Sequence, residues 1–145
     1  MDKLIDTSAK DLYNHILHAK ATGNFCFIIG NGGSACESDH FAQDLVGKGY
    51  RAISLCNSGN ITAIANDRGF VNVFADQLKV LANKGDLLIT LSTSGTSPNI
   101  VAAQLVAKNM GMKVFILPTN KETGQPTAYT QDIHLQIFHK AYQAL

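Results

Sequence analysis

The sequence predicts an α/β fold, a three-layer sandwich in which helices cover both faces of a mostly parallel sheet of about four to five strands. The first observation is that short runs rich in Ile, Leu, Val or Phe recur along the chain, at residues 25–29, 51–55, 87–91 and 113–117. Their apolar character indicates strands that are buried on both faces. The second observation is that segments of helical pattern separate these runs, and such alternation is typical of a parallel sheet.

Helices are expected at residues 8–21, 35–46, 71–82, 98–110 and 130–144. In the first helix, Leu12 and Ile16 lie on one face. The fourth is expected to stop at Gly111, because glycine adopts the backbone conformation of a helix C-cap at little cost. The last has an apolar side that includes Ile137 and Leu145, so it is expected to pack against another surface.

Composition indicates one domain with a substantial core, since the chain has 145 residues of which 46% are hydrophobic and 16% charged. The formal net charge of +1 argues against a broad basic face for nucleic acid. No segment has the pattern of a leader or the length of a membrane span, so a cytoplasmic protein is expected. Cys26, Cys36 and Cys56 lack disulfide or zinc-finger spacing and are expected to be reduced.

A hydroxyl-rich loop follows the third predicted strand. Ser97 is placed to be the N-cap of the next helix and Pro98 its first residue. The free amides and positive dipole end of that helix would then point to where Ser92, Thr93 and Ser94 converge, which predicts a phosphate site that needs no lysine. An ordinary Ser/Thr-rich turn is the alternative.

A glycine-rich turn follows the first predicted strand, and its residues are Gly30, Asn31, Gly32, Gly33 and Ser34. Ser34 and Glu37 have the spacing of a capping box, which predicts that a helix begins with Ser34 as its N-cap. The turn lacks the lysine of a nucleotide P-loop and the full dinucleotide-binding spacing. Both loops leave strands at the carboxyl edge of the sheet, where open α/β sheets bind their ligands.

Two predicted helices carry side chains suited to proton transfer or metal binding. His40 and Asp44 are four residues apart and therefore point the same way. A His and a carboxylate at that spacing can ligate a metal or share proton-transfer work. The last helix carries Gln131, His134 and His139. For an isolated His on such a helix, the alternative is a hydrogen-bonded structural role.

Five short motifs occur in order along most of the chain. They are Gly30-Asn31-Gly32-Gly33-Ser34-Ala35, His40-Phe41-Ala42, Ala65-Asn66-Asp67, Leu91-Ser92-Thr93-Ser94-Gly95-Thr96-Ser97, and Gln131-Asp132-Ile133-His134 with His139. Their order and spacing resemble the SIS (sugar isomerase) domain family of the phosphoheptose isomerase type. The resemblance implies a single SIS domain over residues 1–145, shortened at the N-terminus and between residues 117 and 131.

This resemblance implies an isomerase that interconverts sedoheptulose 7-phosphate and D-glycero-D-manno-heptose 7-phosphate through an enediolate, for the heptose of lipopolysaccharide. Asp44 and His139 would act as acid and base, and the hydroxyl loop would hold the phosphate. The remaining substrate contacts would come from Asn31, Gly32, Gly33, Ser34, Asp67 and Gln131. Some family members hold zinc at the positions of His40, Asp44, Gln131 and His139.

Asp44 stands where the family usually has Glu, so its carboxylate recedes by one methylene. A misplacement of roughly 1.5 Å can lower a rate about a hundredfold, whereas metal ligation tolerates the change more easily. The alternative function is a non-catalytic module that binds a sugar phosphate, or a regulatory protein that binds the replication initiator.

A homo-oligomer is also expected, either a tetramer, as the resemblance implies, or a dimer. The apolar pairs Leu12/Ile16 and Ile137/Leu145 are predicted to leave helix faces for a neighbouring subunit. By the same resemblance, Asp44 and His139 could meet across an interface between subunits. No nucleic acid or membrane partner is expected.

Overall fold

The computed structural model describes residues 1–145 and contains a four-stranded sheet in which neighbouring strands are parallel. The strand order is β2-β1-β3-β4. The strands are β1 (Cys26–Gly30), β2 (Ala52–Ser54), β3 (Leu87–Leu91) and β4 (Lys113–Ile116). The predicted parallel sheet is confirmed, and every strand end lies within one residue of its expected position.

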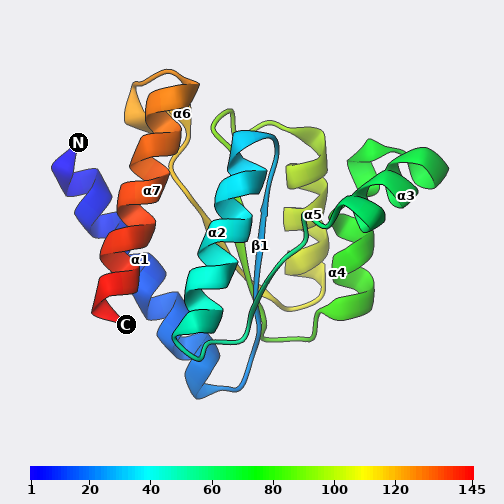
Figure 1. Cartoon of the computed structure of the whole chain (residues 1–145), viewed down its shortest axis with the longest axis horizontal. Helices are drawn as coiled ribbons and strands as arrows, with labels where there is room; N and C mark the ends of the chain where they lie inside the picture. The colour runs from blue at the N-terminus through cyan, green and yellow to red at the C-terminus, as the bar shows by residue number, and fades with distance from the viewer.

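Helices lie on both sides of this sheet and complete the three layers (Figure 1). One face is covered by α1 (Asp2–Ala21), α2 (Gly33–Gly47) and α7 (Thr127–Ala144). The other face is covered by α3 (Ser58–Arg68), α4 (Ala75–Leu81) and α5 (Pro98–Asn109). A 3-10 turn (Phe70–Asn72) precedes α4, and the short helix α6 (Asn120–Thr123) joins β4 to α7.

Alternate residues of the strands divide the core into two halves. In β1, Cys26 and Ile28 pack with α1, α2 and α7, whereas Phe27 and Ile29 pack with α3, α4 and α5. Every residue of β1 and β3 is buried, as expected for central strands that are covered on both faces. The edge strands β2 and β4 are partly exposed.

The topology opens a crevice between β1 and β3. After β1 the chain crosses to α2 on one face, and after β3 it crosses to α5 on the other face. The two loops therefore separate above adjacent strand ends, which is the arrangement that binds ligands in open α/β sheets. Gly30 allows α2 to follow β1 closely, because a Cβ atom at Gly30 would lie 2.7 Å from backbone atoms of Ser34.

The two helices beside the crevice begin differently. Ser97 is the N-cap of α5 and Pro98 its first residue, as predicted. The predicted capping box at Ser34 is wrong, because α2 begins at Gly33 with Gly32 as its N-cap and no side-chain cap. Gly32 has φ +55°, a conformation that glycine adopts far more readily than serine, so the cap falls two residues before Ser34.

Other helix boundaries also differ from expectation. Helix α1 begins at Asp2 rather than near residue 8, and the expected helix over 71–82 is divided between the 3-10 turn and α4. Helix α3 was not predicted, and Asn57 caps it by accepting a hydrogen bond from the Asn60 amide at 3.1 Å. Helix α6 was not predicted either, although Thr119 and Glu122 form a capping box there. These two helices therefore form because of local capping residues and not because of an apolar periodic pattern.

The apolar helix faces that were expected to reach a neighbouring subunit pack inside the chain. Leu12, Ile16 and Ile137 have no exposed surface, because α1 and α7 lie against each other on the same face of the sheet. Leu145 is partly buried against the same cluster. The assignment of Leu12, Ile16 and Ile137 to a subunit interface was therefore wrong. No helix has both the length and the apolar character needed to cross a membrane.

Candidate functional site

A polar cavity of about 290 Å³ lies at the carboxyl edge of β1 and β3. It is lined by the glycine-rich loop, the hydroxyl loop and the start of α7, and none of its lining side chains is charged. The lining residues are Asn31, Gly32, Gly33, Ser34, Leu91, Ser92, Thr93, Ser97, Thr127 and Gln131. The cavity thus brings together the expected phosphate and sugar contacts, with the exception of Ser94 and Asp67.

The hydroxyl loop is held in shape by its own side chains. Ser92 Oγ accepts a hydrogen bond from the Gly95 amide at 3.1 Å, and Ser94 Oγ accepts one from the Thr96 amide at 3.2 Å. Ser94 Oγ also lies 3.3 Å from Ser97 Oγ. Because a hydroxyl can accept and donate at the same time, Ser92 keeps a hydrogen for an anion. Ser94 is exposed outside the cavity wall and contacts it through Ser97.

Gln131 reaches the cavity because Gly33 has no side chain. A Cβ atom at Gly33 would lie 3.0 Å from Gln131 Nε2 and 3.3 Å from Gln131 Oε1. Any larger residue at Gly33 would push the Gln131 amide away from the start of α2. Gly33 therefore permits the close approach that places Gln131 in the cavity wall.

A reciprocal pair of amide hydrogen bonds joins the two loops. Asn31 Nδ2 donates to Asn99 Oδ1 at 2.9 Å, and Asn99 Nδ2 donates to Asn31 Oδ1 at 2.8 Å. Asn99 is the second residue of α5 and is 2% exposed. The sequence prediction assigned Asn31 to the sugar alone and did not identify Asn99. The only sequence signal for Asn99 is an amide directly after the Ser-Pro start of a helix.

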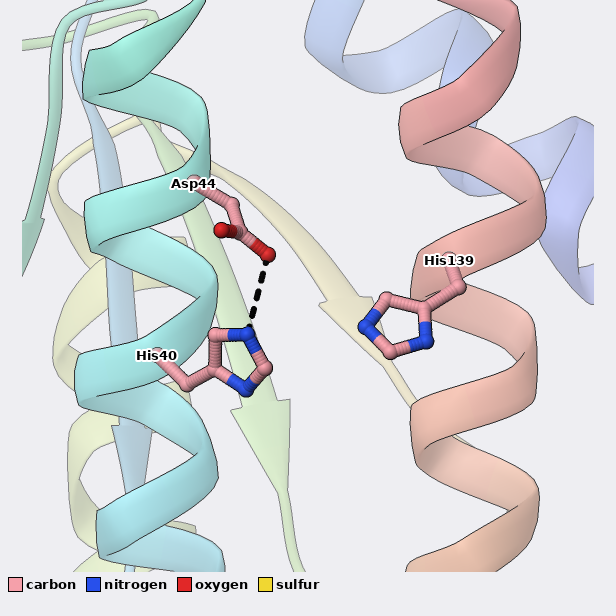
Figure 2. A group of neighbouring side chains, drawn as sticks. All are labelled: His40, Asp44 and His139. Atoms are coloured by element: carbon pink, nitrogen blue, oxygen red, sulfur yellow. Dashed lines mark ion pairs between the residues drawn. The ribbon is translucent and has the colours of Figure 1, made fainter.

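A second polar group lies between α2 and α7 (Figure 2). His40 Nε2 lies 3.2 Å from Asp44 Oδ2, and His139 faces both residues from α7. One ligand atom from each of the three residues lies within 4.8 Å of the others. Asp44 and His139 thus meet within one chain, which corrects the expectation that they could meet across an interface.

An aromatic stack beside this group sets the spacing of α2 and α7. The rings of Phe41 and Phe138 are nearly parallel, at 6°, with centroids 3.8 Å apart. Neither side chain is exposed. Phe41 follows His40 and Phe138 precedes His139, so the buried stack fixes the distance across which the two histidines face each other.

The group of His40, Asp44 and His139 fits a zinc ion. Two imidazoles and a carboxylate with an open fourth position form a known type of catalytic zinc site. Ligands about 2.1 Å from a tetrahedral ion are roughly 3.5 Å apart, so ligand atoms within 4.8 Å need only small rotations to converge.

Gln131, the expected fourth ligand, does not join this group. It lies eight residues before His139 on α7, which is about 12 Å at a rise of about 1.5 Å per residue. Its amide instead approaches Gly33. A metal held by His40, Asp44 and His139 is therefore out of reach of Gln131 in the same chain.

Glu37 lies on α2 between the cavity and His40, and the sequence interpretation treated it only as part of a capping box. Burial, with a smaller effect of the Asp132 carboxylate, raises the pKa of Glu37 to about 7. Its Oε2 atom is buried without a hydrogen-bond partner. The sequence signal that could have identified it is its position one helical turn before His40.

Two further residues of the sequence motifs lie away from the site. Asp67 is exposed near the end of α3, where its carboxylate accepts a hydrogen bond from Asn66 Nδ2 at 3.0 Å. Asp67 does not line the cavity, because α3 packs on the face of the sheet opposite α7. His134 is fully buried with Nε2 2.6 Å from the Pro118 carbonyl oxygen, and burial lowers its pKa. His134 thus has the structural role that was the alternative for a histidine on this helix.

Comparison with known proteins places these features in a family. Residues 3–117 match the SIS domain model. The phosphoheptose isomerase of Sodalis glossinidius is 36% identical over 141 residues, which cover 93% of this chain and 72% of that protein. A phosphoheptose isomerase of Escherichia coli is 39% identical over 119 residues, and the match covers 78% of this chain and 61% of that protein.

Solved structures agree with this assignment. The phosphoheptose isomerase of Neisseria gonorrhoeae aligns with a TM-score of 0.91 at 28% identity, over 99% of this chain and 87% of that one. A phosphoheptose isomerase of Francisella tularensis aligns with a TM-score of 0.84 at 27% identity, over 94% of this chain and 83% of that one. The chain therefore belongs to the SIS domain family, in which these relatives are phosphoheptose isomerases.

Proposed function

We propose that the chain is an aldose–ketose isomerase that interconverts sedoheptulose 7-phosphate and D-glycero-D-manno-heptose 7-phosphate. The observation that carries the proposal is the meeting of Asp44 and His139 within 4.8 Å, on the same two helices that border the polar cavity. The names of the relatives support the substrate. Such a reaction would supply lipopolysaccharide heptose in the cytoplasm.

The cavity suits the phosphate end of the sugar. Its wall contains the hydroxyls of Ser92, Thr93 and Ser97, and Ser97 caps the N-terminus of α5. The positive end of the helix dipole favours a negative ligand there, and hydroxyl donors can complete its coordination. A neutral polar wall holds a dianion through these dipoles without a neutralising ion pair.

The spacing of the two parts matches a long sugar phosphate. Ser34 lines the cavity and His40 belongs to the second group, six residues along α2 and thus about 9 Å at about 1.5 Å per residue. In an extended heptulose 7-phosphate, five carbon–carbon bonds of about 1.5 Å and the ester place the C2 carbonyl on the order of 9 Å from phosphorus. The reacting carbons would therefore lie beside Asp44 while the phosphate occupies the cavity.

Asp44 and His139 can perform the proton transfers of the isomerisation. Asp44 takes a proton from C1 of the ketose while His139 donates a proton to O2, which gives the enediol. Loss of a proton from O1 and addition of one at C2 then yield the aldose, with no oxidant or reductant required. His40 fixes the Asp44 carboxylate through the 3.2 Å contact, and correct placement of a base is worth orders of magnitude in rate.

The proposal also includes a site for one zinc ion, which His40, Asp44 and His139 would hold. Asp44 and His139 transfer protons as described above when no ion occupies this site. When bound, zinc supplies a Lewis acid that polarises a carbonyl oxygen. Elemental analysis of untagged protein after zinc addition should give close to one ion per chain, and His40→Ala should abolish binding. Retention of zinc by that variant would exclude this ligand set.

A homo-oligomer, either dimer or tetramer, is also part of the proposal. The His40 side chain is 47% exposed, so the space between α2 and α7 is open to water on one side. A second copy that covers this opening would exclude water during proton transfer. Light scattering should show an oligomer, and a monomer at working concentration would contradict this part.

An isomerase assay tests the function directly. Parent protein should convert sedoheptulose 7-phosphate to the aldose, and Asp44→Asn should bind the sugar phosphate but lower the rate at least a hundredfold. Asp39→Asn is the matched control, because Asp39 is exposed on the same helix. Binding without conversion by the parent would favour the non-catalytic sugar-phosphate module instead.

A further inference from the structure

We infer that Asn99 is a positioning residue of the phosphate site, which acts through Asn31 to hold the glycine-rich loop and the hydroxyl loop at a fixed spacing. The inference rests on the proposed function in one respect, namely that the cavity binds a phosphate group. The side chain of Asn99 is not among the cavity-lining residues, so its effect on the ligand is indirect.

The orientation of the amide pair is determined by a third hydrogen bond. The Ile100 amide donates to Asn99 Oδ1 at 3.0 Å. Since only oxygen can accept that hydrogen, Asn99 Nδ2 must face Asn31 Oδ1, and Asn31 must present Nδ2 in return. The two side chains therefore fit together in one arrangement, in which both bonds are made.

The amide pair lies where the chain provides little other connection between the loops. Asn31 follows β1 and leads to one face of the sheet, whereas Asn99 follows β3 and lies at the start of α5 on the other face. No other side-chain hydrogen bond joins residues 31–34 to residues 92–99. The pair therefore bridges the two loops beyond the last β1–β3 pairing, Gly30 with Leu91, at the point where the loops diverge to opposite faces of the sheet.

This connection matters for an anion because the cavity has no charged wall. Binding depends on several dipoles, including those near Gly33 and Ser97, that must converge on one position. Fixed dipoles bind charge better than mobile ones, since no reorganisation is needed on binding. Asn31 itself lines the cavity, so the pair holds this part of the wall in place.

A double-mutant cycle tests the inference. Calorimetric titration with inorganic phosphate should show about a tenfold loss of affinity for Asn99→Ala and for Asn31→Ala, from the loss of two hydrogen bonds. The double variant should be no weaker than either single variant, because all three lose the same pair. In the isomerase assay, KM for the sugar phosphate should rise by a similar factor with kcat changed less than about threefold.

Two further variants complete the test. Gln104→Ala is the matched control. Gln104 lies on the same helix, and its Nε2 donates to Thr90 Oγ1 at 3.0 Å, but neither residue lines the cavity, so this variant should bind phosphate like the parent. If Asn99→Ala does not fold, Asn99→Leu keeps the side-chain volume at this buried position and should show the same loss.

The possible outcomes separate the inference from the proposed function. If the parent binds phosphate and the folded Asn99 variants stay within twofold of it, the inference is overturned and the phosphate site stands. If only Asn31→Ala weakens binding, and only for the sugar phosphate, Asn31 contacts the sugar directly and Asn99 positions nothing. If the folded parent binds neither phosphate nor sugar phosphate, the cavity assignment fails, and the inference fails with it.

Discussion

Replacement of Glu37 by Gln should stabilise the protein at alkaline pH. The carboxyl group of Glu37 is half-buried, its Oε2 atom has no hydrogen-bond partner, and its pKa is raised to about 7. Burial favours the neutral acid, and Asp132 on α7 adds repulsion against the ionised form. Above pH 7 the folded state therefore holds an unfavourable charge, which the neutral amide of the Glu37→Gln variant would not carry.

The sign and size follow from the shift of the pKa. A carboxyl group whose folded pKa lies above its unfolded value, 4.5, stabilises the fold at low pH and loses that contribution as pH rises through about 7. The full shift would correspond to about 3.5 kcal/mol at about 1.4 kcal/mol per unit, and solvent screening of a half-exposed group reduces this to roughly 1–2 kcal/mol. The variant should gain that amount at pH 8 and about a quarter of it at pH 5.

Urea denaturation at both pH values measures this difference. Asp39→Asn provides the control, since it removes an exposed carboxylate from the same helix and should change the free energy of unfolding by less than about 0.5 kcal/mol at either pH. Glu37→Gln would refute the reasoning if it were equally stabilising at pH 5 and pH 8, or if it were destabilising at pH 8.

Three further predictions test other parts of the account. Because burial lowers the folded pKa of His134, its contribution to stability should be complete above the unfolded pKa, 6.5, and should fall as the pH drops below that value. His134→Gln should therefore flatten the pH dependence of Tm between pH 7.5 and 5.5, and an unchanged slope would exclude His134 as the cause of that dependence. Mixing Asp44→Ala with His139→Ala chains should restore no activity after demonstrated subunit exchange, because both residues act within one chain; recovery would place the site across an interface. The double variant Ser94→Ala with Ser97→Ala should bind phosphate more weakly, since hydrogen bonds to a charged group contribute about 1.5–3 kcal/mol each. An affinity within twofold of the parent, measured by calorimetry, would show that the hydroxyl loop does not bind the phosphate.

The sheet and the two ligand loops could be predicted because their signals are local. The run Leu87–Leu91 is continuously apolar and fully buried, and the Ser97–Pro98 start of α5 follows from capping rules that involve adjacent residues. Helix α3 has no such signal. Only Ile64 of that helix is buried, so no apolar stripe forms, and its single capping residue, Asn57, is equally common in turns.

The geometry of the site could be predicted only in part. His40 and Asp44 share a helix, so their proximity follows from their spacing. The approach of His139 depends on how α7 packs, and the Phe41–Phe138 stack that sets this packing joins residues far apart in the chain. The separation of Gln131 from His139, by contrast, follows from helical spacing on one helix, and the distance of about 12 Å between them could have been predicted from the sequence.

The packing of the helices on the sheet also explains why the predicted subunit-contact residues were wrong. Leu12 and Ile16 form an apolar stripe, but a stripe alone does not distinguish a face that covers the protein's own sheet from one that contacts another subunit. The same holds for Asn31, whose amide suits a sugar hydroxyl equally well until Asn99 is brought opposite it.

Conversion of sedoheptulose 7-phosphate in D2O, followed by NMR, tests the central claim most directly. Transfer of protons by Asp44 and His139 predicts an aldose that carries deuterium at C2. The Asp44 carboxyl group takes the C1 proton and returns one to C2, and its side chain is 18% exposed, so its proton exchanges with solvent before it is returned. Asp44→Asn should give neither product nor deuterium uptake, although it still binds the sugar phosphate. Conversion without deuterium, or an Asp44→Asn variant as active as the parent, would contradict the proposed proton transfer between these two helices.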